Sequence, residues 1–272
     1  MQTMGSKRFR NLDTWIGGIE LKKINRVGET NRNFYGTLMK IIEYNGARDI
    51  VIEFQDEYKV RRKGDYKEFK NGCFKNPYDK SILDVGFLGE GKYNWKDSYD
   101  IYEVWKSMLI RCYDPYYINK EPTYKDCYVC DEWHNFQNFA KWYEENYYEV
   151  KEQRMCLDKD ILNKGNKIYS PETCIFVPSR INILFTKRQR DRGEYPIGVG
   201  YREKYNNLQS RCCTLNGRVS LGIFPLNRPF QAFYTYKQFK ENYIKQVADE
   251  YKDLIPKELY DAMYKYEVEI ND

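Results

Sequence analysis

The chain has 272 residues, of which 17% are aromatic, and a formal net charge of +5. This length suits two or three small domains, each with its own core, and we expect an α+β, multi-domain protein. No apolar run approaches the roughly 20 residues that cross a bilayer, and no signal peptide precedes the eight cysteines. We therefore expect reduced thiols in a cytoplasmic protein with no membrane partner.

Charge is distributed unevenly along the chain. Residues 180–245 contain 13 Lys and Arg against 4 Asp and Glu, whereas residues 246–272 contain 3 against 8. A basic block of this kind favours a polyanionic partner, although basic faces also bind acidic protein surfaces. The opposite charge of the last residues predicts a separate, solvated end.

The N-terminal third reads as a polar arm over residues 1–24 followed by a small β domain over residues 25–72. Residues 35–44 and 49–54 are rich in strand-forming side chains, and Asn45-Gly46 between them predicts a turn. We expect an SH3-like barrel here. Residues 73–96 contain Pro77 and several glycines and predict a connector.

Two amphipathic helices are predicted in the central part of the chain. Asp97 or Ser98 caps the first, in which apolar residues recur at helical spacing up to Cys112. A short strand over residues 127–130 precedes the second helix, which begins near Trp133. Residues 156–161 and the apolar run 174–178 follow, and Ser179 is expected to cap a last helix that carries Ile181, Ile183, Leu184 and Phe185.

The C-terminal part predicts three strands, over residues 197–201, 208–213 and 219–224, and a long helix with Pro229 near its start. Asn216-Gly217 joins the last two strands as a tight hairpin. Three strands are too few to close a barrel, so one sheet face is expected to stay open to a partner. Residues 253–272 are predicted to form an acidic helical tail.

A run of ordered motifs between residues 99 and 185 resembles the HNH-type nucleases of phages and mobile elements. It includes Trp105-Lys106-Ser107-Met108, Arg111-Cys112-Tyr113, Val129-Cys130-Asp131-Glu132-Trp133, Leu157-Asp158-Lys159-Asp160, Tyr169-Ser170-Pro171-Glu172-Thr173-Cys174 and Asn182. The resemblance implies an HNH-like domain over residues 97–187 with a ββα-containing core.

The same resemblance assigns the catalytic positions. Asp158 matches the metal-binding acid, Lys159 the general-base histidine and Asn182 the late position, with Mg²⁺ or Mn²⁺ as the implied metal. A lysine is protonated at neutral pH and is a poor base, and the chain's one histidine, His134, lies outside this motif. We therefore expect a degenerate nuclease fold in which Lys159 contacts phosphate instead.

Residues 198–248, with Leu221-Gly222-Ile223-Phe224 and Ala232-Phe233, resemble the AP2-like DNA-binding domain often attached to such nucleases. This implies an AP2-like domain over residues 188–252 whose sheet enters the major groove of double-stranded DNA. The strand cations available to it are Arg202, Lys204, Arg211 and Arg218. The preceding linker adds Lys187, Arg188 and Arg190, which either follow the phosphate backbone or simply solubilise the linker.

Cys127 and Cys130 form the chain's one CxxC motif, whose spacing is compatible with a structural Zn²⁺ site. If these residues lie on a strand, however, their sulfurs point to opposite faces. Buried free thiols are the alternative.

These features together predict a phage-type DNA-binding protein built on an inactive HNH-like scaffold, acting in the cytoplasm of an infected bacterial host. Two alternatives remain open at this point. One is a counter-defence protein that binds and inhibits a host immune complex, and the other is a weak metal-dependent nicking endonuclease. Loss of DNA affinity on mutating the sheet arginines, capture of a host protein, or nicking lost in Asp158→Ala would distinguish them.

Overall fold

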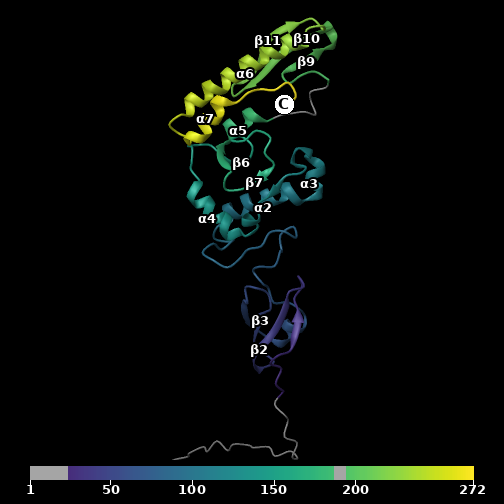
Figure 1. Ribbon diagram of the computed structural model, residues 1–272, viewed down its shortest axis with the longest axis vertical. Coiled ribbons are helices and arrows are strands. Elements are labelled where there is room, and N and C mark those ends of the chain that lie inside the picture. Colours follow the sequence, from purple (N-terminus) through teal and green to yellow (C-terminus); the bar gives the residue numbers. More distant parts are fainter. Residues whose placement is uncertain (1–23, 187–193) are drawn as a thin grey trace, which may run out of the picture. The chain divides into compact units, whose positions relative to one another are not determined.

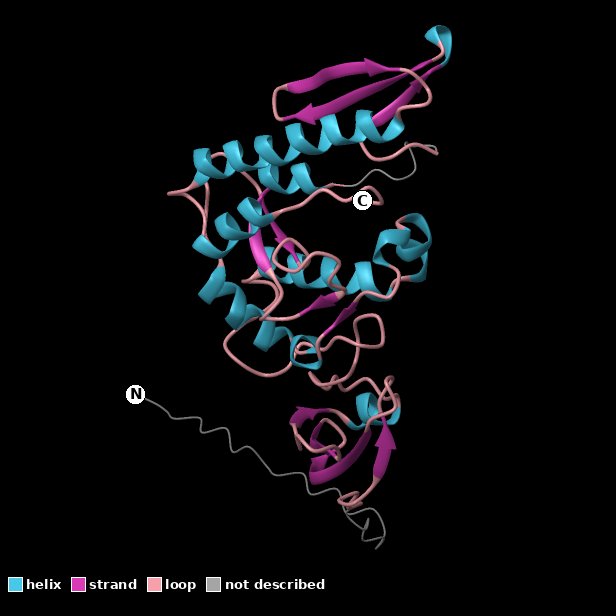
Figure 2. Ribbon diagram, turned by 45° about the horizontal axis from the view of Figure 1, so that its top comes forward, coloured by secondary structure: helices cyan, strands magenta, loops and turns pink. Residues whose placement is uncertain are grey.

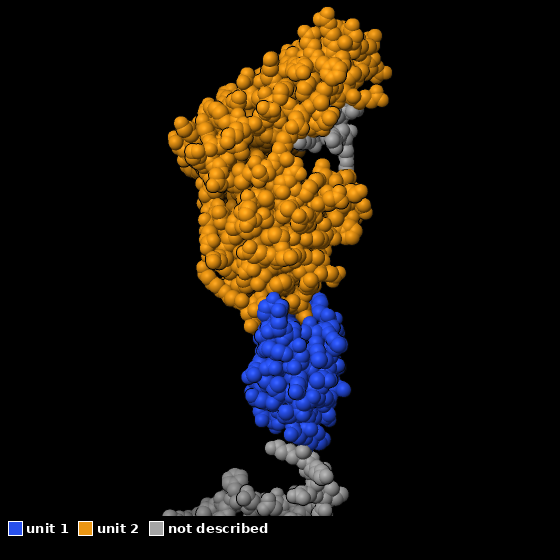
Figure 3. Space-filling view, in the orientation of Figure 1, with its two compact units in different colours: residues 1–76 blue, residues 77–272 orange. Residues whose placement is uncertain are grey.

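The computed structural model describes residues 24–186 and 194–272 and divides into two compact units, residues 1–76 and residues 77–272 (Figures 1 and 3). Both units combine helices with small sheets, which confirms the mixed α+β class. Among the described residues, no helix has the length and apolarity needed to span a membrane. The predicted N-terminal arm lies outside the described residues, except for Ile24.

The first unit is an antiparallel meander of four strands in the order β1-β2-β3-β4, followed by a short helix. Alternating apolar residues of β2 and β3 and Phe69 of α1 form its core and are fully buried. The SH3-like barrel stays a prediction. The elements are β1 (Thr30–Arg32), β2 (Leu38–Gly46), β3 (Asp49–Phe54), β4 (Arg61–Gly64) and α1 (Tyr66–Lys70).

The predicted turn at Asn45-Gly46 is wrong by two residues. Gly46 pairs with Asp49, so the chain reverses at Ala47 and Arg48, and Asn45 and Gly46 belong to β2. Two register irregularities in the β2–β3 pairing, after Ile41 and after Tyr44, lengthen β2 relative to β3 and displace the turn.

Two helices with the predicted periodicity carry the aromatic core of the second unit. They are α2 (Tyr99–Tyr113), which begins after Ser98, and α4 (Phe136–Asn146). Trp105 of α2 is fully buried, and its indole Nε1 donates to the carbonyl oxygen of Trp133 at 2.7 Å. Between the two helices lie α3 (Pro115–Lys120), the 3₁₀ helices η1 (Pro122–Tyr124) and η2 (Asp131–His134), and β5 (Tyr128–Val129).

Of the predicted connector over residues 73–96, residues 77–96 pack on this core instead. Ile82, Val85 and Leu88 lie against the buried aromatic residues, and Phe87 bridges to Asn135. Gln137 of α4 donates to the carbonyl oxygens of Leu88 and Tyr93. The segment forms few regular elements because side chains such as Gln137 satisfy its backbone polar groups.

Two strand pairs follow. β6 (Met155–Asp158) pairs antiparallel with β8 (Ile175–Pro178), while β7 (Ile168–Tyr169) pairs parallel with β5. After β8 come the short α5 (Ser179–Asn182) and the 3₁₀ helix η3 (Ile183–Phe185). The chain order here is β6, β7, β8 and α5, and the ββα core that the HNH resemblance implies stays a prediction.

The C-terminal sheet has the order β11-β10-β9, with α6 lying along one of its faces (Figures 1 and 2). The hairpin between β10 and β11 forms, but Thr214 pairs with Gly217, so its two turn residues are Leu215 and Asn216, one position before the predicted Asn216-Gly217. The long helix begins at Pro229, as predicted. The elements are β9 (Val199–Arg202), the 3₁₀ helix η5 (Glu203–Tyr205), β10 (Asn207–Thr214), β11 (Gly217–Phe224), α6 (Pro229–Tyr251) and α7 (Lys257–Lys265).

The prediction of a solvated acidic tail over residues 253–272 is wrong. Leu259 and Met263 of α7 are fully buried against α6 and residues from β8, α5 and η3, and Val268 packs under the C-terminal sheet. Most acidic side chains of this segment face outward, and the buried apolar ones lie between them. A charge count does not resolve this difference between the two faces.

Gly198 allows the C-terminal sheet to approach α6 closely. Its φ is +78°, and a Cβ atom at this position would overlap the ring of Tyr236. The residue before β9 must therefore be glycine, both for its backbone conformation and for the space it leaves.

We expect Gly198→Ala to destabilise the protein more than Gly165→Ala, by about 1 kcal/mol or more, because only the former adds a clash to the backbone strain. Gly165 is the matched control, since its φ is +84° and a Cβ atom there would meet no other atom within 4 Å. Urea unfolding of both variants measures the difference. Equal losses of stability would show that contact with Tyr236 does not limit the approach of the sheet.

Candidate nucleic-acid interface

Three of the predicted DNA-binding arginines lie on one face of the C-terminal sheet. Directly paired residues share a face, and the register pairs Arg202 with Asn207, Arg211 with Ser220, and Arg218 with Cys213. The alternation of β10 places Asn207, Arg211 and Cys213 opposite Leu208 and Cys212, which are buried against α6. We call this side the open face.

Each arginine has a distinct local setting. The Arg211 guanidinium lies over Gly200, where a Cβ atom would be 3.3 Å from one of its nitrogens. The Arg202 guanidinium stacks on the Tyr205 ring at 4.2 Å, and Arg218 is exposed at the hairpin. Among the described residues, none of the three has an ion-pair partner.

Few negative charges oppose these cations. Between residues 199 and 224 the sequence contains one acidic residue, Glu203, which lies in η5 and not in a strand. Lys204 also lies in η5, with its ammonium 5.5 Å from the Tyr205 ring, so it stands at the end of the sheet. Lys187, Arg188 and Arg190 lie outside the described residues.

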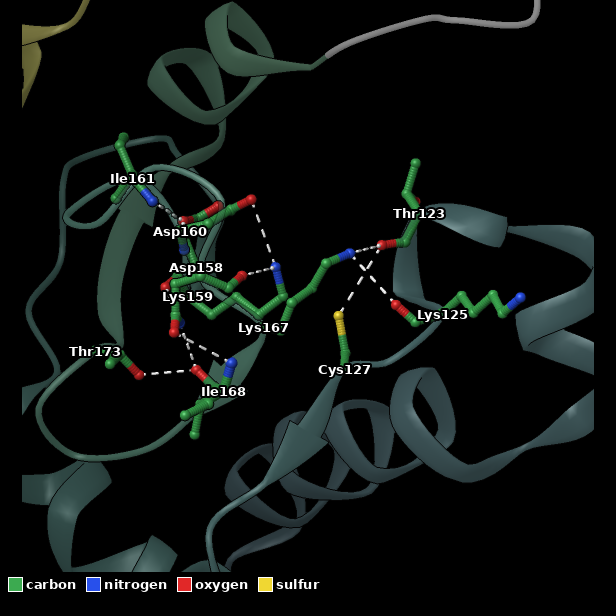
Figure 4. A network of polar contacts seen from close by, with 11 residues as sticks. Thr123, Lys125, Cys127, Asp158, Lys159, Asp160, Ile161, Lys167, Ile168 and Thr173 are labelled. Atoms are coloured by element: carbon green, nitrogen blue, oxygen red, sulfur yellow. Dashed lines mark hydrogen bonds and ion pairs between the residues drawn. The ribbon is translucent and has the colours of Figure 1, made fainter. Parts of the chain in front are cut away.

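The structure brings the three predicted catalytic positions together. Asp158, Lys159 and Asn182 line a pocket of about 200 Å³ that is also lined by Arg111 and Tyr169. The first two lie at the end of β6 and Asn182 at the end of α5, so the pairing of β6 with β8 places them near one another. Figure 4 shows the surrounding network of polar contacts.

Asp158 caps the turn after β6. Its Oδ1 accepts hydrogen bonds from the backbone amides of Asp160 at 2.9 Å and Ile161 at 2.8 Å. Burial and, after it, repulsion from Asp160 raise the pKa of Asp158. The carboxylate therefore has a structural task at this position, and its negative charge is costly there.

Lys159 is 7% exposed and acts as a tether. Its ammonium donates to the carbonyl oxygen of Asn166 at 3.0 Å and lies 3.4 Å from Asp160 Oδ2 (Figure 4). Asn166 in turn donates through Nδ2 to the carbonyl oxygens of Lys159 and Ile168, each at 2.7 Å. Lys159 thus fastens the loop between β6 and β7 and has little freedom to contact a phosphate.

The residues at this pocket do not fit the divalent metal that the HNH resemblance implies. Asp158 uses one oxygen for backbone amides, and the ammonium of Lys159 is held beside Asp160. In the described part of the chain, no three His, Cys, Asp or Glu residues are arranged to hold a metal ion. The ammonium of Lys159, held near the carboxylates of Asp158 and Asp160, repels a divalent metal ion that would bind these oxygens.

Within residues 24–186 and 194–272, Cys127 and Cys130 do not belong to any group of three or more side chains that could hold a Zn²⁺ ion. Cys127 is buried with its thiol 4.0 Å from the carbonyl oxygen of Thr123, and Cys130 is half-buried. The two residues flank β5, and burial raises the pKa of both thiols. In the metal-free chain, this environment favours the uncharged thiol.

His134 lies in η2, away from the Asp158 pocket. Its Nε2 is 3.1 Å from the carbonyl oxygen of Val129 and its Nδ1 is 3.7 Å from Asp131. Burial lowers the pKa of His134 despite the nearby carboxylate. The imidazole therefore has a local structural role.

Sequence reasoning missed Arg111, which projects from α2 and lines the Asp158 pocket. Burial alone lowers its pKa, but Tyr169 and Tyr124 outweigh this effect and the pKa of Arg111 rises. Arg111 belongs to the motifs of the HNH resemblance, yet nothing in its local sequence distinguishes it from a solvated helix residue. Its role depends on the distant β7 and η1.

We expect Asp158→Ala to lower the free energy of unfolding by about 1 kcal/mol, because two backbone amides lose their acceptor. Asp158→Asn is the matched control. It keeps an oxygen acceptor and removes a desolvated charge, so its stability at neutral pH should equal or exceed that of the wild type. Denaturant unfolding at neutral pH tests this, and a similar loss in both variants would show that the charge, not the cap, supports the fold.

Comparison with known proteins identifies no relative: no family model, no curated protein and no solved structure matches the chain.

Proposed function

We propose that the chain binds double-stranded DNA through the open face of its C-terminal sheet. The observation that carries this proposal is the set of three arginines without ion-pair partners in the described structure, on strands that contain no carboxylate. Solvated cations are common on proteins, but most lie among carboxylates. A sheet face with charges of one sign only favours a polyanion.

The side chains of this face suit a base-reading role. Arginine donates two hydrogen bonds to the O6 and N7 of guanine, and glutamine can pair with adenine. Gln209 lies on the open face between the arginines and donates to Ser220 Oγ at 2.9 Å. Sheets enter the major groove in several known classes of DNA-binding protein. We therefore propose modest sequence preference in addition to phosphate binding.

In this proposal, the Asp158 pocket stabilises the fold and does not hydrolyse DNA. Lys159 is tethered where the resemblance implies a general base, and Asp158 caps a turn. A phage-type protein that binds DNA in the cytoplasm of a bacterial host, on a nuclease-like fold without the hydrolytic step, agrees with this chemistry.

We expect the triple variant Arg202→Ala, Arg211→Ala, Arg218→Ala to bind duplex DNA about a hundredfold more weakly. The slope of log affinity against log salt concentration should flatten by up to about three, one for each phosphate that an arginine no longer neutralises. Fluorescence anisotropy of a labelled duplex of about 30 base pairs in a salt series, without divalent metal, measures both quantities.

The matched control is Lys141→Ala, Lys151→Ala, Lys252→Ala, which removes the same charge from exposed positions outside the sheet. If both triple variants lose affinity equally, net charge alone explains binding and the open face is not the interface. Absence of binding by the wild type at low salt also contradicts the proposal and leaves an inhibitor of a host protein as the alternative. Nicking of plasmid DNA with Mg²⁺ that is lost in Asp158→Asn would restore the nuclease hypothesis.

A further inference from the structure

A second pocket, of about 300 Å³, lies beside the C-terminal sheet. Its lining comes from η3, the start of β9, the hairpin strands, α6 and the segment after α7. Much of its wall is apolar or aromatic, formed by Val199, Tyr236, Tyr266 and Val268. A pocket of this size admits a small organic molecule.

A buried lysine lines this pocket. Lys240 of α6 is 7% exposed, and its ammonium has no hydrogen-bond or ion-pair partner among the described residues. Two other lysines do have a counter-charge. Lys237 forms an ion pair with Glu241 at 2.7 Å, and Lys164 forms one with Asp272 at 2.9 Å. The Lys240 ammonium is not one of the fully buried polar atoms that lack a partner, so it keeps a little contact with solvent at the pocket. Most of the side chain is nevertheless withdrawn from water without a counter-charge, which points to an anionic partner that the chain itself does not supply.

The other charges at this pocket strengthen that conclusion. Arg211 and Arg218 line it from the sheet, and the carboxylate of Asp272 is already bound to Lys164. The titratable groups that act on Lys240 are the thiols of Cys212 and Cys213, and burial lowers its pKa. The pocket therefore has an excess of positive charge within an apolar wall.

We propose that this pocket binds the phosphate group of a small phosphorylated molecule, with Lys240 as the buried counter-charge and Arg211 and Arg218 at the entrance. Two guanidinium groups match phosphate oxygens in geometry and charge better than they match a single carboxylate. Lys240 is too deeply buried for the backbone phosphates of a duplex, which stay on the surface of a wide rod. The proposal does not depend on DNA binding.

The test is isothermal titration calorimetry of the full chain with pyrophosphate and with inorganic phosphate at low salt. We expect saturable binding of one pyrophosphate per chain, weakened about tenfold or more in Lys240→Met, because the buried ammonium no longer opposes the phosphate charge. Lys245→Met is the control, since Lys245 lies on the same helix and does not line the pocket. Its affinity should stay within about twofold of the wild type.

A thermal midpoint for Lys240→Met equal to or above that of the wild type would support a binding role, because a structural lysine would lower it on removal. If Lys240→Met does not fold, Arg218→Met replaces it, since Arg218 is exposed and its loss should also weaken pyrophosphate binding. No saturable heat in the wild type, or equal affinities in Lys240→Met and Lys245→Met, would overturn the proposal.

Two further variants, each tested for duplex and for pyrophosphate binding, distinguish this inference from the proposed function. Arg202 does not line the pocket, so Arg202→Ala should weaken duplex binding and leave pyrophosphate binding unchanged. Lys240→Met should weaken pyrophosphate binding and leave duplex binding unchanged. If Lys240→Met instead weakens duplex binding as much as Arg202→Ala does, the phosphate belongs to the duplex and the small-molecule proposal fails.

Discussion

Apolar side chains along α6 pack against two different sets of strands. Ala232, Phe233 and Tyr236 in its first half cover the C-terminal sheet. Ile244 and Val247 in its second half join a cluster that contains β8, α5 and α7. Each large apolar side chain that is fully buried here contributes about 1.5–3 kcal/mol. One helix therefore holds the C-terminal sheet to the rest of the second unit.

The features of functional interest follow from this packing. Because α6 occupies one face of a three-stranded sheet, the three arginines lie on the other face, and two of them, Arg211 and Arg218, also line the Lys240 pocket. Because the residues after α7 return beside α6, they close one side of the Lys240 pocket. The predicted domains 97–187 and 188–252 accordingly share a core, and deleting the second would expose Ile175 and Val177 of β8.

Much of this arrangement was accessible from the sequence. Helical spacing identified α2, α4 and α6, and the Asn216-Gly217 signal located the hairpin to within one residue. Strand alternation is a period of two, so the positions of Arg211 and Arg218 near that hairpin were enough to suggest a shared face. The HNH resemblance named Asp158 and Asn182, which do line one pocket.

The sequence predictions that proved wrong share a physical cause: contacts between residues far apart in the sequence decide which side chains are buried. Lys240 lies in a polar stretch of α6, and nothing nearby in sequence shows that the C-terminal segment covers it. Residues 77–96 have the composition of a linker, but Gln137 provides their hydrogen bonds from a helix far along the chain. Leu259 and Met263 lie among acidic residues and are buried through a face that charge counting ignores.

The half-buried His134 has a consequence for the whole surface. The chain has one histidine against 45 Lys and Arg and 40 Asp and Glu, and burial lowers the pKa of that imidazole. Lysine, arginine and solvent-exposed carboxyl groups keep their charges between about pH 6 and pH 8. The electrostatic potential of the surface is thus nearly constant when its surroundings acidify, so its attraction to a polyanion is governed by ionic strength and not by protons.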